Sequence, residues 1–254
     1  MPALVRKFLR SARTDGLIEA IYKSVRYPFK EDWQILERRI FALNTIEDRF
    51  TEIYKRRDYW GAGTTVSGHG STLRYTENLR CRLPELFNKF SVKGIFDAPC
   101  GDFNWMREVL KQNDIYYTGG DIVLPLVESL RSKFEDSKTK FIHIDLTRQR
   151  FPDADLMICR DCLFHLSFSD AKCVLQNFVD SNIRYLLTTT HTPTGEFLNS
   201  DIATAAFRPI DLFTAPYNFP RDVLFRIPDW SPPDEQKEMC LWTKEQISSA
   251  LRKA

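Results

Sequence analysis

Four carboxylates accompany four short apolar runs in the middle of the sequence. Asp97 lies in VKGIFDA, Asp121 ends IYYTGGD, Asp145 ends KFIHID and Asp161 ends DLMICRD. Where parallel strands end together, such carboxylates line one edge of a sheet and can accept the hydroxyls of a ribose. An acidic edge suits a ligand with an amine and positive charge but suits a pyrophosphate badly. Because the G-x-G-x-x-G phosphate cradle is also missing, the pattern argues against a nicotinamide or flavin dinucleotide.

Two histidines lie close to these strand ends. His165 comes four residues after Asp161, and His191 directly follows the apolar run IRYLLTTT. Imidazole titrates near neutral pH, so either ring is a candidate general base. His165 stands between Phe164 and Leu166, which is equally compatible with a buried, hydrogen-bonded core residue.

The stretch Cys159-Arg160-Asp161-Cys162 raises the question of a zinc site. Zinc sites usually show two close ligand pairs, whereas Cys159 falls inside an apolar run. We therefore predict no metal site, although a magnesium ion would use the same carboxylates as the ligand described above. His143 also falls inside an apolar run and is interpreted as structural.

Beyond residue 92, short apolar runs alternate with segments of helical pattern. The runs are apolar throughout, and stretches such as LVESLRSKF and AKCVLQNFV come between them. This pattern indicates a parallel sheet covered by helices on both faces. Two later runs, DVLFRIPDW and KEMCLW, supply further strands, and TKEQISSALRKA supplies a closing helix. We predict an α/β fold with a doubly wound, Rossmann-like, seven-stranded and mostly parallel sheet.

Residues 1–60 are predicted to form an N-terminal helical extension. Between about 31 and 57 the apolar residues recur at steps of three, four and seven, the period of an amphipathic helix that packs on the main domain. Residues 1–25 interleave apolar and basic side chains, which fits either a helix that docks or frays, or a weak contact with an anionic membrane surface. With 13 Lys/Arg and 9 Asp/Glu, the extension carries +4, against +2 for the whole chain.

Residues 61–90 combine a Gly-rich loop with a connecting helix. The chain has only 10 glycines, and eight of them fall between positions 61 and 120. Sharp turns and close backbone approaches are therefore concentrated in that window. The loop in GAGTTVSGHGSTLRY is either a flexible joint or a lid over a ligand.

The runs FDAPCGDFNWM, YTGGDI, FIHIDL and LMICRDCLFHL resemble the successive motifs of the class I S-adenosylmethionine-dependent methyltransferases. The resemblance covers about 92–191 and extends more weakly to the C-terminus, where this family has an antiparallel strand pair. It implies a methyltransferase domain over 91–254. The first motif of the family usually carries three glycines after its acidic residue. Here Pro99 and Phe103 stand at two of those places, and Gly101 remains.

The resemblance implies that S-adenosyl-L-methionine is the cofactor. Its methionine part would lie at the first-strand turn, its ribose at the end of the second strand and its adenine at the end of the third. The residues implied are, in that order, Asp97, Ala98, Pro99, Cys100 and Gly101, then Asp121 and Ile122, then Asp145 and Leu146. Arg160 and Asp161 would line the junction with the substrate, and a lid would bring Arg74 to the cofactor's carboxylate. Each Asp could instead cap the helix that follows it.

Methyl transfer to oxygen requires a base near the attacking hydroxyl. The candidates are His165, His191 and Asp161. The acceptor would bind the polar and aromatic insertion at about 192–222, which we interpret as a substrate-binding segment. Side chains there can hydrogen-bond a polyol or stack on a ring, namely Asn199, Asp201, Arg208 and Tyr217. The insertion could equally be a surface excursion packed by its own aromatic residues.

Composition limits the remaining choices. No apolar run reaches the length of a membrane span, basic residues interrupt MPALVRKFLRSAR, and six cysteines fit reduced thiols, so we expect a cytoplasmic protein. A net charge of +2 does not indicate a dedicated nucleic-acid binder. We predict O-methylation of a small-molecule or glycan-like acceptor. The alternative is a nonenzymatic adenosine-ligand sensor or scaffold, and the oligomeric state is left open.

Overall fold

The computed structural model describes residues 30–56, 59 and 65–252. The chain divides into two compact units, residues 1–44 and residues 45–254. In the first unit the described helix is α3 (Lys30–Phe41). The basic segment 1–25 and the first part of the Gly-rich loop lie outside the described residues.

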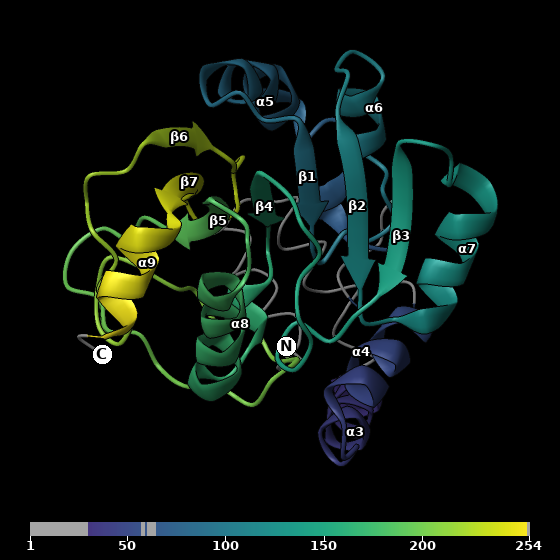
Figure 1. Cartoon of the computed structure of the whole chain (residues 1–254). Coiled ribbons are helices and arrows are strands. Elements are labelled where there is room, and N and C mark those ends of the chain that lie inside the picture. The colour runs from purple at the N-terminus through teal and green to yellow at the C-terminus, as the bar shows by residue number, and fades with distance from the viewer. Residues whose placement is uncertain (1–29, 57–58, 60–64, 253–254) are drawn as a thin grey trace. The chain divides into compact units, whose positions relative to one another are not determined.

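The second unit contains a seven-stranded sheet with the strand order β3-β2-β1-β4-β5-β7-β6. The first five strands are parallel, and β7 runs antiparallel to both β5 and β6 (Figure 1). The predicted fold class, including the C-terminal antiparallel pair, is confirmed. The strands are β1 (Gly94–Asp97), β2 (Tyr116–Asp121), β3 (Thr139–His143), β4 (Leu156–Cys159), β5 (Tyr185–His191), β6 (Phe225–Pro228) and β7 (Lys237–Thr243).

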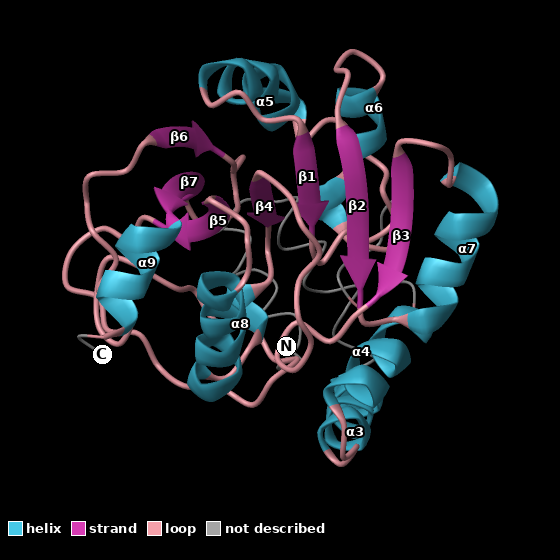
Figure 2. Ribbon diagram, in the orientation of Figure 1, coloured by secondary structure: helices cyan, strands magenta, loops and turns pink. Residues whose placement is uncertain are grey.

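Helices cover both faces of this sheet (Figure 2). One apolar cluster joins the sheet to α5 (Glu77–Lys89), α6 (Met106–Leu110) and α7 (Leu124–Phe134), and a second joins it to α8 (Phe168–Asp180) and α9 (Lys244–Leu251). In β1, Ile95 enters the first cluster and Phe96 the second. A central strand buried on both faces must be apolar throughout, which explains the unbroken runs in the sequence.

The amphipathic stretch predicted as one helix over 31–57 forms two. α3 ends at Phe41 and α4 spans Ile46–Lys55. Thr45 accounts for the break, because its hydroxyl accepts the Asp48 N–H at 3.0 Å and caps a new N-terminus. α4 belongs to the second unit.

β2 extends beyond β1 at the carboxyl edge of the sheet. Asp97 pairs in register with Gly119, so Asp121 lies two residues further along. The chain after β1 folds back over this extension, and the Cys100 N–H donates to the Gly120 carbonyl at 2.8 Å. A Cβ on Gly120 would lie 2.8 Å from Ile144 and 2.9 Å from Phe96. The glycine therefore allows close packing under the first-strand turn.

We expect Gly120→Ala to lower the free energy of unfolding by about 1–3 kcal/mol, because the new methyl group overpacks a close-packed site. Gly94→Ala is the matched control, since a Cβ there would meet its nearest neighbour at 3.8 Å, an ordinary contact. Urea unfolding of both variants measures the difference. Equal losses in the two variants would contradict the packing argument.

Candidate functional site

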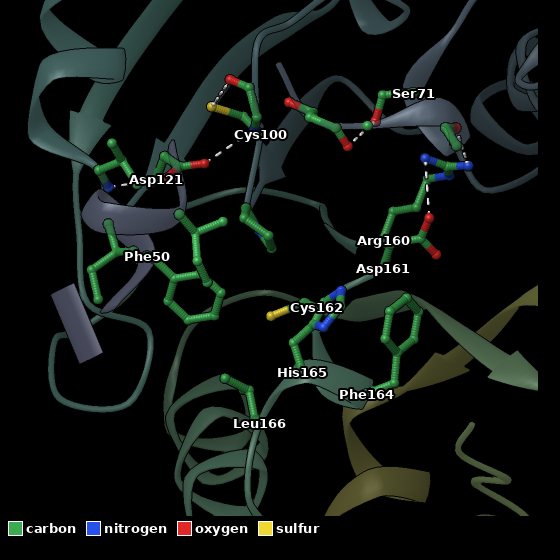
Figure 3. Close-up of a pocket in the computed structure, with 18 of the residues that line it drawn as sticks. Phe50, Ser71, Cys100, Asp121, Arg160, Asp161, Cys162, Phe164, His165 and Leu166 are labelled. Carbon is green, nitrogen blue, oxygen red and sulfur yellow. Dashed lines mark hydrogen bonds and ion pairs between the residues drawn. The ribbon is translucent and has the colours of Figure 1, made fainter. Parts of the chain in front are cut away.

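A cavity of about 620 Å³ lies at the carboxyl edge of the sheet. Its lining comes from α4, from the 65–75 segment, from the turns after β1 to β5 and from the β6–β7 connection. Figure 3 shows Asp121 and Phe50 on one side of the cavity and Arg160, Asp161 and Phe164 on the other. The strand ends that were predicted to share one edge therefore share one pocket.

The first-strand turn presents Asp97 and Gly101 to the pocket. The Asp97 side chain is almost fully buried and accepts a hydrogen bond from the Tyr117 hydroxyl at 2.8 Å. Burial raises the pKa of Asp97 to about 7, although Tyr117 and Arg160 both favour the carboxylate. Gly101 has φ 54°, the left-handed region that glycine adopts without strain.

Phe103 also adopts the left-handed region, with φ 59°. This is one of the positions where the resembled motif has glycine, and the conformation costs a non-glycine residue about 1–3 kcal/mol. The ring packs 5.0 Å from Tyr117, 5.1 Å from Phe141 and 5.7 Å from Phe134, measured between ring centroids. Aromatic packing thus holds the turn where a glycine would otherwise relax it.

Asp121 connects the first two strand ends. Its carboxylate accepts the Gly101 N–H at 3.1 Å and the Val123 N–H at 3.0 Å. Burial raises its pKa, and these backbone donors oppose the shift. Asp145, at the end of the third run, is half-buried and accepts the Thr147 N–H at 2.9 Å. Its neighbour Leu146 also lines the pocket.

The 65–71 loop, which belongs to the described part of the predicted lid, is hydrogen-bonded to the first-strand turn. The Val66 N–H donates to the Asp102 carboxylate at 3.1 Å, and the Asp102 N–H donates to the Ser67 hydroxyl at 2.9 Å. A Cβ on Gly101 would lie 2.4 Å from the Ser67 oxygen. The retained glycine therefore permits the loop to lie directly against the turn.

Arg160 lies at the centre of a buried ion cluster. Its guanidinium donates to both oxygens of Asp229, at 2.8 and 3.1 Å, and to the Gly70 carbonyl at 2.8 Å. Lys237 bonds Asp161 at 2.5 Å, and Arg160 lies 3.4 Å from the same carboxylate. Burial opposes ionisation of Asp161, but the two cations outweigh it and hold its pKa below the usual range. Asp161 is therefore an ionised partner of the cluster and a poor base.

The two histidines differ in which ring nitrogen carries a proton. His165 Nδ1 lies 2.8 Å from the Ala206 carbonyl, so Nδ1 must donate, and the neutral ring keeps its lone pair on Nε2. His191 Nδ1 accepts the Ile210 N–H at 3.1 Å, so its proton is on Nε2. Burial lowers the pKa of each ring to about 4. Both rings are neutral at pH 7, one with an acceptor at Nε2 and the other with a donor.

α4 covers part of the pocket with apolar side chains. Ile46, Phe50, Ile53 and Tyr54 belong to the lining. Polar contacts hold the helix at two places: Glu47 lies 3.1 Å from His143 at the end of β3, and Arg49 donates to the Thr204 carbonyl at 3.2 Å. The helix thus reaches from the end of β3 to the segment after β5, so His143 has the structural contacts expected of it.

Most residues predicted for the cofactor and the catalytic step line this pocket, but two do not. Ala98 is fully buried among the side chains of the second apolar cluster, because it faces the core rather than the cavity. Arg74 is exposed and outside the lining, while the next residue, Tyr75, turns inward. The structure gives neither side chain a place in the pocket.

The four acceptor residues predicted in the 192–222 insertion also lie outside the pocket lining, since each bonds within the fold. Asn199 donates to the Asp211 and Ala215 carbonyls, and Asp201 accepts the Phe168 N–H at the start of α8. Arg208 is buried and donates to the Leu166 carbonyl and the Tyr217 hydroxyl. From the same insertion, Phe207 does line the pocket and is 54% exposed.

Tyr75, Lys237 and Phe50 are among the pocket residues that were not anticipated. Tyr75 and Lys237 lie against one another, with the ammonium 5.5 Å from the ring centroid, and Phe50 enters from α4. Burial, followed by Asp234, raises the pKa of Tyr75, which keeps its hydroxyl protonated. Only Phe50 carried a sequence signal, as part of the amphipathic stripe.

Within residues 30–56, 59 and 65–252, no group of three or more His, Cys, Asp or Glu side chains is arranged to hold a metal ion. None of the helices described there is both long and apolar enough to cross a membrane.

Comparisons with known proteins identify the fold. No protein-family model and no curated protein matches the sequence. Among solved structures, magnesium protoporphyrin IX methyltransferase (ChlM) from Synechocystis PCC 6803, with bound SAM, matches with a TM-score of 0.54 at 13% identity over 80% of this chain and 98% of that one. This chain has the class I methyltransferase fold. N-methyltransferase NodS from Bradyrhizobium japonicum WM9 matches with a TM-score of 0.50 at 10% identity over 67% of this chain and 96% of that one.

In this methyltransferase fold, Asp97 makes stability depend on pH. Its pKa is about 7 when folded, against an ordinary value of 3.8, so between those values the folded chain holds a proton that the unfolded chain has released. Asp97 therefore costs stability progressively as pH rises through that window. Asp97→Asn removes the cost and still offers an acceptor to Tyr117.

We expect the stability of the Asn variant relative to wild type to increase between about pH 5 and about pH 8, by at most about 4 kcal/mol. Urea unfolding of both proteins at the two pH values measures it. The histidines contribute equally to both proteins and cancel in the difference. A difference that is independent of pH would show that Asp97 ionises normally.

Proposed function

We propose that this protein is an S-adenosylmethionine-dependent methyltransferase that acts on a small acceptor, at oxygen. The observation that carries the proposal is the ordered set of carboxylates at the ends of β1, β2 and β3, gathered on one pocket. The fold, which is shared with a methyltransferase solved with bound SAM, supports the same conclusion. We also propose that the protein is located in the cytoplasm.

The carboxylates that line the pocket fit this cofactor chemically. S-adenosylmethionine carries a sulfonium, an amino group and two ribose hydroxyls, and the carboxylates of Asp97, Asp121 and Asp145 complement these groups. We assign the methionine part to Asp97 with Pro99, Cys100 and Gly101, the ribose to Asp121 with Ile122, and the adenine to Asp145 with Leu146. A cavity of about 620 Å³ is within the size range of cofactor sites.

The bound cofactor supplies a methyl group on a positively charged sulfur. The protein must then place an acceptor hydroxyl beside that group and remove its proton. His165 lines the pocket, and we assign the base to it in our proposal, whereas Nε2 of His191 carries a proton and can only donate a hydrogen bond. Arg160 and Asp161 line the pocket at the turn after β4, and we assign them to the junction between cofactor and acceptor.

The range of acceptors that we propose is narrower than the range that the sequence suggested. A glycan acceptor depended on Asn199, Asp201, Arg208 and Tyr217, which are engaged elsewhere in the fold. The lining beyond the carboxylates is mainly aromatic and aliphatic. These surroundings favour a small molecule over a polyol.

A nonenzymatic adenosine-ligand sensor would use the same carboxylates. The neutral, pocket-lining His165 favours an enzyme, because a sensor has no use for a proton acceptor beside the ligand. Turnover with a panel of small molecules separates the two functions. Binding without any methylated product would favour the sensor.

For the cofactor site, we expect Asp121→Asn to weaken S-adenosylmethionine binding at least tenfold, because one acceptor and the negative charge are lost at the ribose position. Isothermal titration calorimetry measures the affinity. Asp136→Asn is the matched control, since Asp136 precedes β3 at the opposite edge of the sheet. Unchanged affinity in Asp121→Asn would remove the ribose assignment.

For the base, we expect His165→Asn to lower kcat by a factor of about 10² to 10⁴. The asparagine amide can still donate to Ala206, so the local fold is kept while the proton acceptor is lost. His191→Asn can still accept the Ile210 N–H, and we expect a loss of about tenfold or less. In wild type, kcat measured at saturating cofactor falls as pH drops through about 4, where His165 becomes protonated. The reverse order of losses would make His191 the base.

A further inference from the structure

His191 brings a hydrogen-bond donor to the pocket that no described residue accepts. Its Nδ1 accepts the Ile210 N–H at 3.1 Å, which leaves the proton on Nε2. His191 is 4% exposed and belongs to the pocket lining. In the part of the chain that the structure describes, the fully buried side-chain atoms without a partner are Nε of Arg80 and Nε of Arg208, and Nε2 of His191 is not among them. The Nε2–H of His191 therefore reaches the open space of the cavity.

His191 lies away from the strand ends that we assign to the cofactor. In the order β3-β2-β1-β4-β5, its strand is separated from β1 by β4, which puts it about 10 Å from β1. Leu187 is level with Asp97 across the sheet, so His191 lies four residues, or about 13 Å, further along. Its ring packs 5.3 Å from Phe164, which Figure 3 shows across the cavity from Asp121. The donor therefore faces the part of the pocket that remains for the acceptor.

The charges beside His191 cancel one another. Burial lowers the pKa of His191 to about 4, so the ring is neutral at pH 7. The charged groups that act on it are Lys237 and Asp161, which bond one another at 2.5 Å. The second cation of the cluster, Arg160, donates to Asp229 at 2.8 Å. An anionic ligand group would find no net positive charge here to replace its hydration. The partner that suits Nε2 is therefore a neutral oxygen.

A carbonyl oxygen meets this donor better than a hydroxyl does. A hydroxyl that accepts from His191 still has its own proton to donate. Asp161, the charged acceptor beside the ring, already receives Lys237 and the Thr189 hydroxyl, at 2.5 and 3.1 Å. Phe207 is 54% exposed, and its ring centroid lies 6.4 Å from that of His191, so it offers an apolar surface beside the donor. A carbonyl has no proton to place, and it can lie against Phe207 with its oxygen satisfied.

We propose that the acceptor carries a neutral carbonyl oxygen, distinct from the oxygen that is methylated, and that this carbonyl accepts the Nε2–H of His191. The inference rests on the proposed methyl transfer and adds a binding group to the acceptor, namely a ketone, an ester or an amide. His191 determines specificity by orienting the acceptor and takes no proton in the reaction. Its loss acts on the affinity for the acceptor more than on kcat.

Three probes of similar size test the binding group. Acetophenone has a carbonyl, 1-phenylethanol has a hydroxyl at the same place, and benzoate has a carboxylate. The affinity of the full-length protein for S-adenosylhomocysteine is measured first, by calorimetry. NMR titration of the protein saturated with S-adenosylhomocysteine then measures the affinity for each probe.

Two substitutions separate the donor of His191 from its contact within the fold. His191→Asn can still accept the Ile210 N–H but has no donor at the place of Nε2. His191→Gln can put its amide nitrogen at that place but gives up the bond to Ile210.

We expect acetophenone to bind His191→Asn about three- to tenfold more weakly than wild type, and His191→Gln within about twofold of wild type. In wild type, 1-phenylethanol and benzoate should bind at least about threefold more weakly than acetophenone. His191→Asn should keep the wild-type affinity for S-adenosylhomocysteine.

Four results would overturn the inference. They are no binding of acetophenone, equal binding of 1-phenylethanol or benzoate, a loss in His191→Gln as large as in His191→Asn, and weaker S-adenosylhomocysteine binding in His191→Asn, which would give the donor to the cofactor. If wild type binds S-adenosylhomocysteine while one of these is found, the carbonyl assignment is wrong and the proposed function stands. If wild type does not bind S-adenosylhomocysteine, the proposed function fails, and the carbonyl assignment fails with it.

Discussion

The ion pair between Arg160 and Asp229 determines how the separate parts of this site meet. Both side chains are almost without solvent exposure, at 4% and 1%, and the guanidinium is further engaged by Gly70 and Asp161. One cation thus joins the end of β4, the residue after β6 and the 65–71 loop. Desolvating two charges costs as much as their attraction returns, so such a pair adds little net stability. Its consequence is position: the hydrogen bond from Arg160 to Gly70 ties the loop to the end of β4, in addition to the loop's own hydrogen bonds to the first-strand turn.

The first-strand turn shows how a glycine-poor motif can keep its backbone path. Where the resembled family has glycine, Phe103 adopts the same left-handed conformation and packs among three rings. Gly101 is kept where Ser67 approaches within 2.4 Å of a Cβ position. The retained glycine, Gly101, is the one against which Ser67 of the covering loop packs. At Phe103 the glycine can be replaced because aromatic packing, rather than conformational freedom, fixes the chain there.

Sequence patterns predicted the structural features that depend on residues close together in the chain. Unbroken apolar runs gave the parallel sheet, and the carboxylates at their ends followed because parallel strands end at one edge. The roles of Lys237 and Asp229 could not be predicted from the sequence, because these residues join the ion cluster around Arg160 only when β7 inserts beside β5, far along the chain. The polar residues of the insertion misled for a related reason. Asn199 and Arg208 satisfy buried backbone carbonyls, and a sequence does not distinguish a polar side chain that serves the fold from one that faces a ligand.

The ion cluster also gives Asp161 a part in the proposed reaction without proton transfer to it. In that reaction the cofactor would lose its positive charge with the methyl group, and the proton taken up by His165 would place a positive charge on its imidazole. Asp161 favours that charged ring, and Lys237 and Arg208 oppose it more weakly. Because Asp161 is held ionised by Arg160 and Lys237, it can stabilise the imidazolium while remaining a carboxylate. A mutation in the cluster would then change the rate by altering the charge that faces His165, even where every residue that touches the acceptor is intact.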